Sequence, residues 1–344
     1  STLFVSSNAR RPHWNSERGD RPGQLGGTTM TITEPTRTTI TITPQSPTIG
    51  AEIGGVDLGT DLSDETIADI RQALLDWKVL FFRDQDITTE QHLAFSRRFG
   101  ELEIHPFGAE HPEHPEVLRI THGEGAPGME NGWHSDVTWR QEPSLGSVLR
   151  MIEGPEVGGD TLFADMYEAY EGLPDSVKER VEGRTARHDF VRFKIGLRKQ
   201  GATDEEIAAV EAKFPNPHHP VIRTHPETGR KGIYVNAAFV QEIDDMDADE
   251  SDELLQFLYR QATFPEYQVR LKWRPNTIAF WDNRSVQHYA ASDYYPQTRI
   301  VERLTIIGDR PYYDPAQAPT DLPPRPFKGQ IERFRQNPDW RRRP

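Results

Sequence analysis

The chain has 344 residues, and its 40 Lys and Arg against 54 Asp and Glu give a formal net charge of −14, which argues against polyanionic partners such as nucleic acids and anionic membrane surfaces. No stretch approaches the roughly 18 consecutive apolar residues of a membrane-spanning helix, so a cytoplasmic location is the default expectation. The absence of cysteine excludes disulfides, thiolate metal ligands and cysteine nucleophiles, so any metal must be bound by His, Asp or Glu.

The two ends of the chain differ in composition from its body. Residues 1–37 are rich in Ser, Arg, Gly, Pro and Thr and have almost no apolar periodicity, which predicts a disordered N-terminal tail. Met30 lies inside this segment and is a candidate natural start. Residues 314–344 are rich in Pro and Arg and are predicted to form an extended C-terminal extension. A single domain is therefore expected over residues 38–313.

Helix signals come first in this domain. Ser63, followed by two acidic residues, predicts the N-cap of a helix with one apolar face, and residues 78–83 (KVLFFR) then predict a buried strand. The capping-box pattern, a Thr with Gln or Glu three residues later, predicts further helices after Thr88, ending at Gly100, and after Thr203.

Strand signals dominate the later part of the domain. Residues 269–274 alternate apolar and basic side chains, which is the period-two pattern of a half-buried strand. The apolar run 277–281 (TIAFW) and the segment 299–307 predict two more strands. The chain is therefore expected to be mainly β with flanking helices.

Metal-ligand candidates of the type His-x-Asp/Glu occur at five places, whereas random placement would give about two, so the surrounding residues have to select among them. Four lie beside proline or in a glycine-rich segment and are predicted to be solvated loop residues: His111, His114, His122 and His225. His134 differs, because Trp133, Val137 and Trp139 around it predict an extended, half-buried segment.

In an extended segment, His134 and Asp136 point to the same face with backbones roughly 6–7 Å apart, so both side chains can reach one ion. His288 follows a predicted strand and is the candidate third ligand, although a lone histidine is more often structural. Two histidines and one carboxylate leave three positions open on a metal, which is the arrangement of non-haem Fe(II) oxygenases.

Two arginines lie beyond the third candidate ligand. Arg299 and Arg303 are both at odd positions of the predicted strand 299–307, so their side chains share a face, with about 13 Å between their backbones. An exposed basic face is the simple interpretation. If the face is buried, each guanidinium needs an anion, and its planar fork fits a carboxylate or sulfonate.

Six blocks of this sequence resemble the Fe(II)/2-oxoglutarate-dependent dioxygenases of the taurine dioxygenase (TauD/TfdA) type, which also include 2,4-dichlorophenoxyacetate dioxygenases and alkylsulfatases. The resemblance runs from about Thr48 to Tyr313. Its blocks, in order along the chain, are 49–58, 133–138, 158–162, 219–226, 281–284 and 287–290. It implies a double-stranded β-helix (jelly-roll) core, Fe(II), 2-oxoglutarate as cosubstrate, and O2.

The resemblance also implies roles for single residues. The implied iron ligands are His134, Asp136 and His288. The implied 2-oxoglutarate contacts are Arg299, which pairs with the distal carboxylate, and Thr161. The implied substrate contacts are His105 and Arg303, which hold a sulfonate, and Phe239, which lines the pocket. The expected reaction is hydroxylation of taurine or a related organosulfonate to an aldehyde and sulfite, with succinate and CO2 as co-products.

Two departures from the family pattern put taurine itself in doubt. Gly108 stands where the taurine enzymes have a tyrosine, and residues 188–199 add four basic side chains near the expected lid. The same chemistry on an alkyl sulfate, an aryloxyacetate or an N-carboxymethyl amino acid stays open, as do a non-catalytic anion-binding jelly roll and a zinc hydrolase. A homo-oligomer, dimer or tetramer, is equally open.

Overall fold

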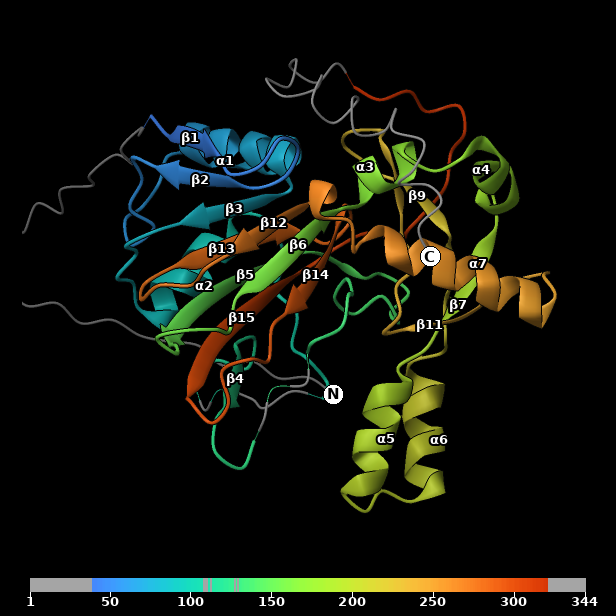
Figure 1. The fold of residues 1–344 in the computed structure, drawn as a ribbon. Coiled ribbons are helices and arrows are strands. Elements are labelled where there is room, and N and C mark those ends of the chain that lie inside the picture. Colours follow the sequence, from blue (N-terminus) through green and yellow to red (C-terminus); the bar gives the residue numbers. More distant parts are fainter. Residues whose placement is uncertain (1–38, 108–110, 112, 127, 129, 321–344) are drawn as a thin grey trace, which may run out of the picture. The chain divides into compact units, whose positions relative to one another are not determined.

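The computed structural model describes residues 39–107, 111, 113–126, 128, 130–320 (Figure 1). The predicted N-terminal tail, Gly108 and most of the predicted C-terminal extension lie outside these residues. The described residues all fall within one unit, Pro35–Pro344, and the domain boundaries at 38 and 313 stay a prediction. Across the described ranges, no helix combines the length and apolarity needed to cross a membrane.

A seven-stranded sheet forms the larger layer of the core (Figure 1). Its strands, in spatial order, are β1 (Thr41–Pro44), β2 (Ala51–Gly54), β3 (Val79–Phe82), β13 (Ile278–Asp282), β5 (Ser144–Glu153), β15 (Arg299–Ile307) and β4 (Leu118–His122). Neighbouring strands are antiparallel except β2 and β3. Strands β13 and β15 confirm the predictions for 277–281 and 299–307.

A three-stranded antiparallel sheet forms the second layer. Its order is β12 (Gln268–Leu271), β6 (Thr161–Asp165) and β14 (Val286–Ala290). Phe163 and Val286 of this sheet pack with Phe81 and Trp281 of the large sheet in one buried cluster. The two sheets therefore enclose a shared apolar interior, and the site described below lies in it.

Two helices, α1 (Asp64–Trp77) and α2 (Thr89–Arg97), cover the opposite face of the large sheet. The period-two rule explains the division, because Leu80 and Phe82 of β3 face the helices, whereas Val79 and Phe81 face the interior. The Ser63 hydroxyl caps α1, and Thr88 forms the predicted capping box of α2. Helix α2 ends at Arg97, before the predicted Gly100.

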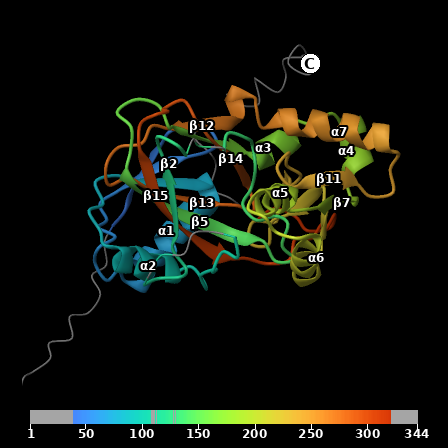
Figure 2. The same cartoon turned by 90° about the horizontal axis from the view of Figure 1, so that it is seen from below.

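The remaining elements all lie between β6 and β12 in the chain. They are α3 (Met166–Glu171), α4 (Asp175–Val181), β7 (Thr185–His188), α5 (Val191–Lys199), α6 (Asp204–Lys213), β8 (His218–Pro220), β9 (Ile222–Thr224), β10 (Lys231–Ile233), β11 (Val240–Ile243), α7 (Ala248–Gln261) and the 3-10 helix η1 (Pro265–Tyr267). Helices α5 and α6 form a hairpin whose two arms lie side by side (Figures 1 and 2). The predicted capping box at Thr203 starts α6.

Two strand boundaries differ from the predictions. The strand predicted at 269–274 ends at Leu271, where its pairing with Thr161 at the start of β6 stops. Lys78 is not in a strand: it ends α1 in the left-handed conformation, with φ 63°, and its buried ammonium pairs with Asp165. This turn redirects the chain from the helix into β3.

Two buried histidines make the fold sensitive to acid. Burial lowers the pKa of His92 to about 3 and that of His219 to about 4, whereas an unfolded chain holds each near 6.5. Below pH 6.5 the unfolded chain therefore binds protons at these histidines, whereas the folded protein does not. Their contribution to the free energy of unfolding is fully present above this pH and is lost as the pH falls toward 4.

We expect acidification from pH 7 to pH 5 to remove about 2 kcal/mol from the free energy of unfolding for each of these histidines. Urea unfolding of wild type and His92→Gln at both pH values measures the effect. The variant should lose about 2 kcal/mol less than wild type on acidification. Equal losses would show that His92 titrates normally in the folded protein.

Candidate active site

His134 and His288 are brought together by backbone pairing. The amide of His134 donates to the carbonyl of His288 over 3.1 Å, and the reverse bond is 2.8 Å long. The predicted extended segment is limited to this single bridge, because the chain turns from Asp136 onward and Val137 has φ 48°. The turn carries Trp139 into the interior and leaves the Asp136 side chain facing the two imidazoles.

The side chains of His134, Asp136 and His288 converge on one point. The Asp136 Oδ1 lies 3.7 Å from Nε2 of His134 and 3.8 Å from Nε2 of His288. Neighbouring ligands of a first-row metal, at bonds of about 2.1 Å, lie about 3 Å apart, so a small inward shift would complete a site. The arrangement therefore fits a metal bound by two histidines and one carboxylate.

The protonation states also suit a metal. Burial alone would raise the pKa of the Asp136 carboxyl, but the Arg303 guanidinium, the two imidazoles and the Ser147 hydroxyl hold it well below its usual range. Burial and the neighbouring His134 lower the pKa of His288 to about 3. The His134 Nδ1 lies 2.7 Å from the Gly132 carbonyl, a contact that fixes Nδ1–H and leaves Nε2 as a free lone pair.

A cavity of about 50 Å³ adjoins His134 and His288. Its lining comprises Ile120, Glu130, His134, Leu149, Thr161, Trp273, Trp281, His288, Ala290, Arg299, Val301 and Arg303. The Thr161 hydroxyl accepts a bond from Trp273 Nε1 over 3.0 Å. Arg299 and Arg303 thus face the interior from one side of β15, as the period-two pattern predicts.

Arg299 is 5% exposed, and no carboxylate of the described residues lies within 4 Å of its guanidinium. Its Nε has no hydrogen-bond partner among those residues. Burial lowers the pKa of Arg299, although Tyr294 and Glu130 oppose the shift. A buried guanidinium without an anion is costly, so this side of the cavity fits an anionic ligand.

His105 and Phe239 lie beside the cavity and are not part of its lining. The His105 ring is 5.7 Å from that of Phe193, and the Phe239 ring is 6.5 Å from that of His134. Phe239 belongs to an apolar cluster, and His105 contacts two of its members, Phe107 and Phe193. We call this cluster the aromatic wall, and it comprises Phe107, Val137, Trp139, Phe190, Phe193, Phe214 and Phe239. Phe193 of α5 is part of this wall, so α5 packs against the site through it.

His105 is a neutral hydrogen-bond donor. Burial, with Arg303 and Arg140 nearby, lowers its pKa to about 3. Its Nδ1 accepts a bond from the Phe107 amide over 3.2 Å, so the ring proton is on Nε2. His105 can therefore hold an anion through one N–H group and contributes no positive charge at neutral pH.

Two of the four basic residues of the segment 188–199, Lys194 and Arg198, pair with carboxylates. Lys194 lies 2.8 Å from Asp189 and 2.8 Å from Glu211, and Arg198 lies 3.5 Å from Asp204. Because both already have carboxylate partners, neither Lys194 nor Arg198 needs a second anion from a ligand.

The prediction of solvated loops fails for two of the four other histidines. His122 ends β4, where its side chain is 11% exposed and its Nδ1 lies 2.9 Å from the Tyr294 hydroxyl. His225 is fully buried, and its Nε2 lies 3.0 Å from Asp282 Oδ2. Sequence reasoning also missed Trp273, Ser147 and Asn283 near the site. Asn283 lies in one of the blocks that carry the family resemblance, which was the available signal.

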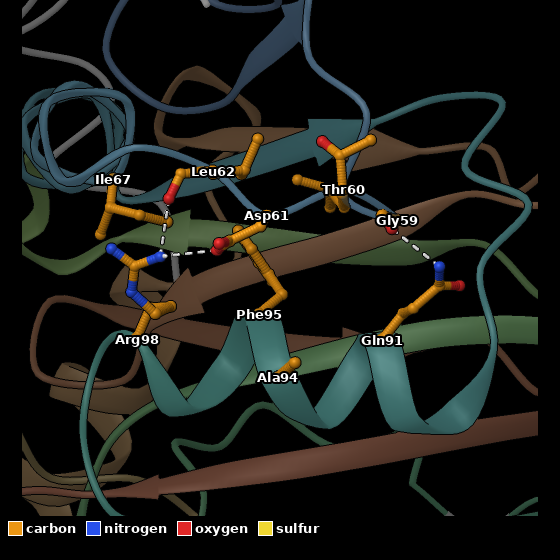
Figure 3. A pocket seen from close by; sticks show the side chains of 10 residues that line it. Gly59, Thr60, Asp61, Leu62, Ile67, Gln91, Ala94, Phe95 and Arg98 are labelled. Atoms are coloured by element: carbon orange, nitrogen blue, oxygen red, sulfur yellow. Dashed lines mark hydrogen bonds and ion pairs between the residues drawn. The ribbon is translucent and has the colours of Figure 1, made fainter. Parts of the chain in front are cut away.

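A larger hollow, of about 330 Å³, lies between α2 and the loop 58–62 (Figure 3). Arg98 donates to the Leu62 carbonyl over 2.8 Å, and Gln91 donates to the Gly59 carbonyl over 2.7 Å. Its polar groups thus pair with one another, and it holds none of the predicted site residues.

Comparisons with known proteins agree with this geometry. The family model "Taurine catabolism dioxygenase TauD, TfdA family" matches residues 41–305. An alkylsulfatase from Acinetobacter baylyi is 35% identical over 271 residues, which cover 76% of this chain and 83% of that protein. An (S)-phenoxypropionate/alpha-ketoglutarate-dioxygenase from Sphingobium herbicidovorans is 35% identical over 280 residues, 78% of this chain and 95% of that protein. The crystal structure of a taurine dioxygenase from Burkholderia xenovorans superposes with a TM-score of 0.68 at 36% identity, over 81% of this chain and 94% of that chain, and supports the predicted jelly-roll core.

Proposed function

Because this chain belongs to the taurine dioxygenase (TauD/TfdA) family, we propose that it hydroxylates the carbon beside the sulfonate or sulfate group of a small organic anion. It is an Fe(II)- and 2-oxoglutarate-dependent dioxygenase, as the resemblance implies, and it uses O2. Fe(II), when bound, supplies the oxidising chemistry together with O2 and 2-oxoglutarate. The co-products are succinate and CO2.

In this proposal His134, Asp136 and His288 hold the iron, and Arg299 with Thr161 holds the distal carboxylate of 2-oxoglutarate. The observation that carries it is the buried Arg299, with no carboxylate of the described residues in reach, beside the converging His-Asp-His group. A planar guanidinium in a desolvated site can take a carboxylate through two parallel bonds.

Arg303 and His105 would hold the anionic group of the substrate, with Phe239 and the aromatic wall against its body. The aromatic wall favours a substrate with an apolar body over taurine, whose ammonium group would need a carboxylate partner. The two carboxylates close to the wall already pair with basic side chains of the protein. Glu103 pairs with Arg140, and Asp189 pairs with Lys194. The names of the two relatives, an alkylsulfatase and a phenoxypropionate dioxygenase, also support an anion with an apolar body.

We expect hexyl sulfate or hexanesulfonate to give a kcat/KM at least tenfold above that of taurine, because about 1.4 kcal/mol of added apolar burial suffices for this factor. Succinate release measured for each compound, with sulfite or sulfate as the second product, tests the proposal. 2-Phenoxypropionate serves as the carboxylate comparison. Preference for taurine would reject the apolar body, and preference for 2-phenoxypropionate would reject the sulfur-containing group.

Family membership sets aside the non-catalytic and zinc-hydrolase alternatives. We further propose a cytoplasmic enzyme that acts on a small molecule and forms a dimer or tetramer.

A further inference from the structure

A buried polar network holds Asp136 through hydrogen bonds to its carboxylate and to its backbone amide. Its Oδ2 lies 2.9 Å from the Ser147 hydroxyl on β5, and its backbone amide donates to Asn283 Oδ1 over 3.2 Å. Ser147 is fully buried and Asn283 is 2% exposed. No hydrogen bond of the described residues joins either one to His134 or His288, so both act on the candidate metal site through Asp136.

The directions of these hydrogen bonds are determined by chemistry. Asn283 Oδ1 also accepts from Trp281 Nε1 over 3.0 Å, and both donors to this oxygen are N–H groups, which fixes the orientation of the amide. Its Nδ2 therefore donates, over 2.6 Å to Ser144 and over 3.4 Å to Ser147. Because an ionised carboxylate only accepts, the proton of Ser147 points at Asp136 Oδ2.

The strands place this network rigidly. Ser147 pairs with Trp281 in the ladder between β5 and β13, and Asn283 follows β13 in the turn toward β14. The backbone N–H of Asn283 donates to the Leu145 carbonyl over 2.9 Å. The same framework that carries β14, and hence His288, thus also orients the Asp136 carboxylate.

We propose that Ser147 and Asn283 are positioning residues that hold Asp136 so that Oδ1 alone reaches the metal. The inference rests on the proposal that His134, Asp136 and His288 bind Fe(II). With Oδ2 engaged by Ser147, the carboxylate supplies one ligand atom, and three positions stay open for 2-oxoglutarate and O2. A carboxylate free to rotate would bind with both oxygens or point away.

The test is the affinity of metal-free protein for Co(II), measured by calorimetric titration in the absence of substrate. Ser147→Ala should raise the Kd 10- to 100-fold, which is the usual effect of removing a group that orients a metal ligand. Its thermal midpoint should fall by only a few degrees, since the change leaves two buried polar groups without one partner each but removes no charge. Asn283→Ala provides a second variant, and it should shift the Kd in the same direction.

Ser144→Ala is the matched control. Ser144 is on the same strand, is 2% exposed and accepts a bond from the same Asn283 amide, but no hydrogen bond joins it to Asp136. Its Kd should stay within about threefold of wild type. A wild-type Kd in both Ser147→Ala and Asn283→Ala would overturn the inference if Asp136→Ala still loses Co(II). A wild-type Kd in Asp136→Ala would instead reject the metal site itself.

Discussion

Asp136→Ala is expected to abolish substrate-stimulated succinate formation and to weaken Fe(II) binding at least 100-fold. Asp136 is the anionic member of the ligand set, and its Oδ1 accepts a 2.7 Å bond from Arg303. The variant loses that ligand. The Arg303 guanidinium then lies beside the two imidazoles without its carboxylate partner and repels a divalent cation. Removing one partner of a buried charge pair costs roughly 3–5 kcal/mol, and about 1.4 kcal/mol is tenfold in affinity.

Anaerobic titration with Fe(II) and chromatographic assay of succinate measure the two effects. Asp309→Ala is a suitable control, because Asp309 accepts two 2.8 Å bonds from the buried Arg223, outside the site. This control should lower the thermal midpoint and keep the affinity for Fe(II). Succinate formation that persists in Asp136→Ala, and also in His134→Ala, would reject these residues as ligands.

Local patterns predicted the parts of the fold that local energetics determine. The caps at Ser63 and Thr88 satisfy backbone groups within three residues, so they can be read from the sequence alone. The shared face of Arg299 and Arg303 follows from the side-chain period of any strand. In each case the interacting groups are close in the chain.

Contacts between residues far apart in the chain could not be predicted from local sequence patterns. His225 precedes proline and was predicted to be solvated, yet it is buried against Asp282, 57 residues away. Ser147 lies inside a strand and has no periodic signal that marks it as a partner of Asp136. The aromatic wall likewise gathers Phe107, Phe190 and Phe239 from separate segments. Tertiary packing, which single-sequence patterns do not encode, determines all three arrangements.

Arg299→Ala is expected to raise the KM for 2-oxoglutarate at least 100-fold and to leave the KM for the organic anion within about threefold. The guanidinium is already desolvated and lacks a carboxylate partner among the described residues, so the incoming cosubstrate meets a preorganised charge. Losing one partner of a buried, hydrogen-bonded charge pair costs roughly 2–5 kcal/mol. Arg299→Lys keeps the charge and loses the planar fork, so it should recover only part of the affinity.

Arg303→Ala should give the opposite pattern, with a raised KM for the organic anion and little change for 2-oxoglutarate. Its affinity for Fe(II) should hold or increase, because Asp136 Oδ1 no longer accepts a bond from a competing cation. Steady-state kinetics in each substrate, with calorimetric titration of the metal, separates these effects. Arg119→Ala on β4 is the control, since the Arg119 side chain is 44% exposed. Both KM values of this variant should equal those of wild type. If both site variants raise the KM for 2-oxoglutarate alike, the division of roles between Arg299 and Arg303 is wrong.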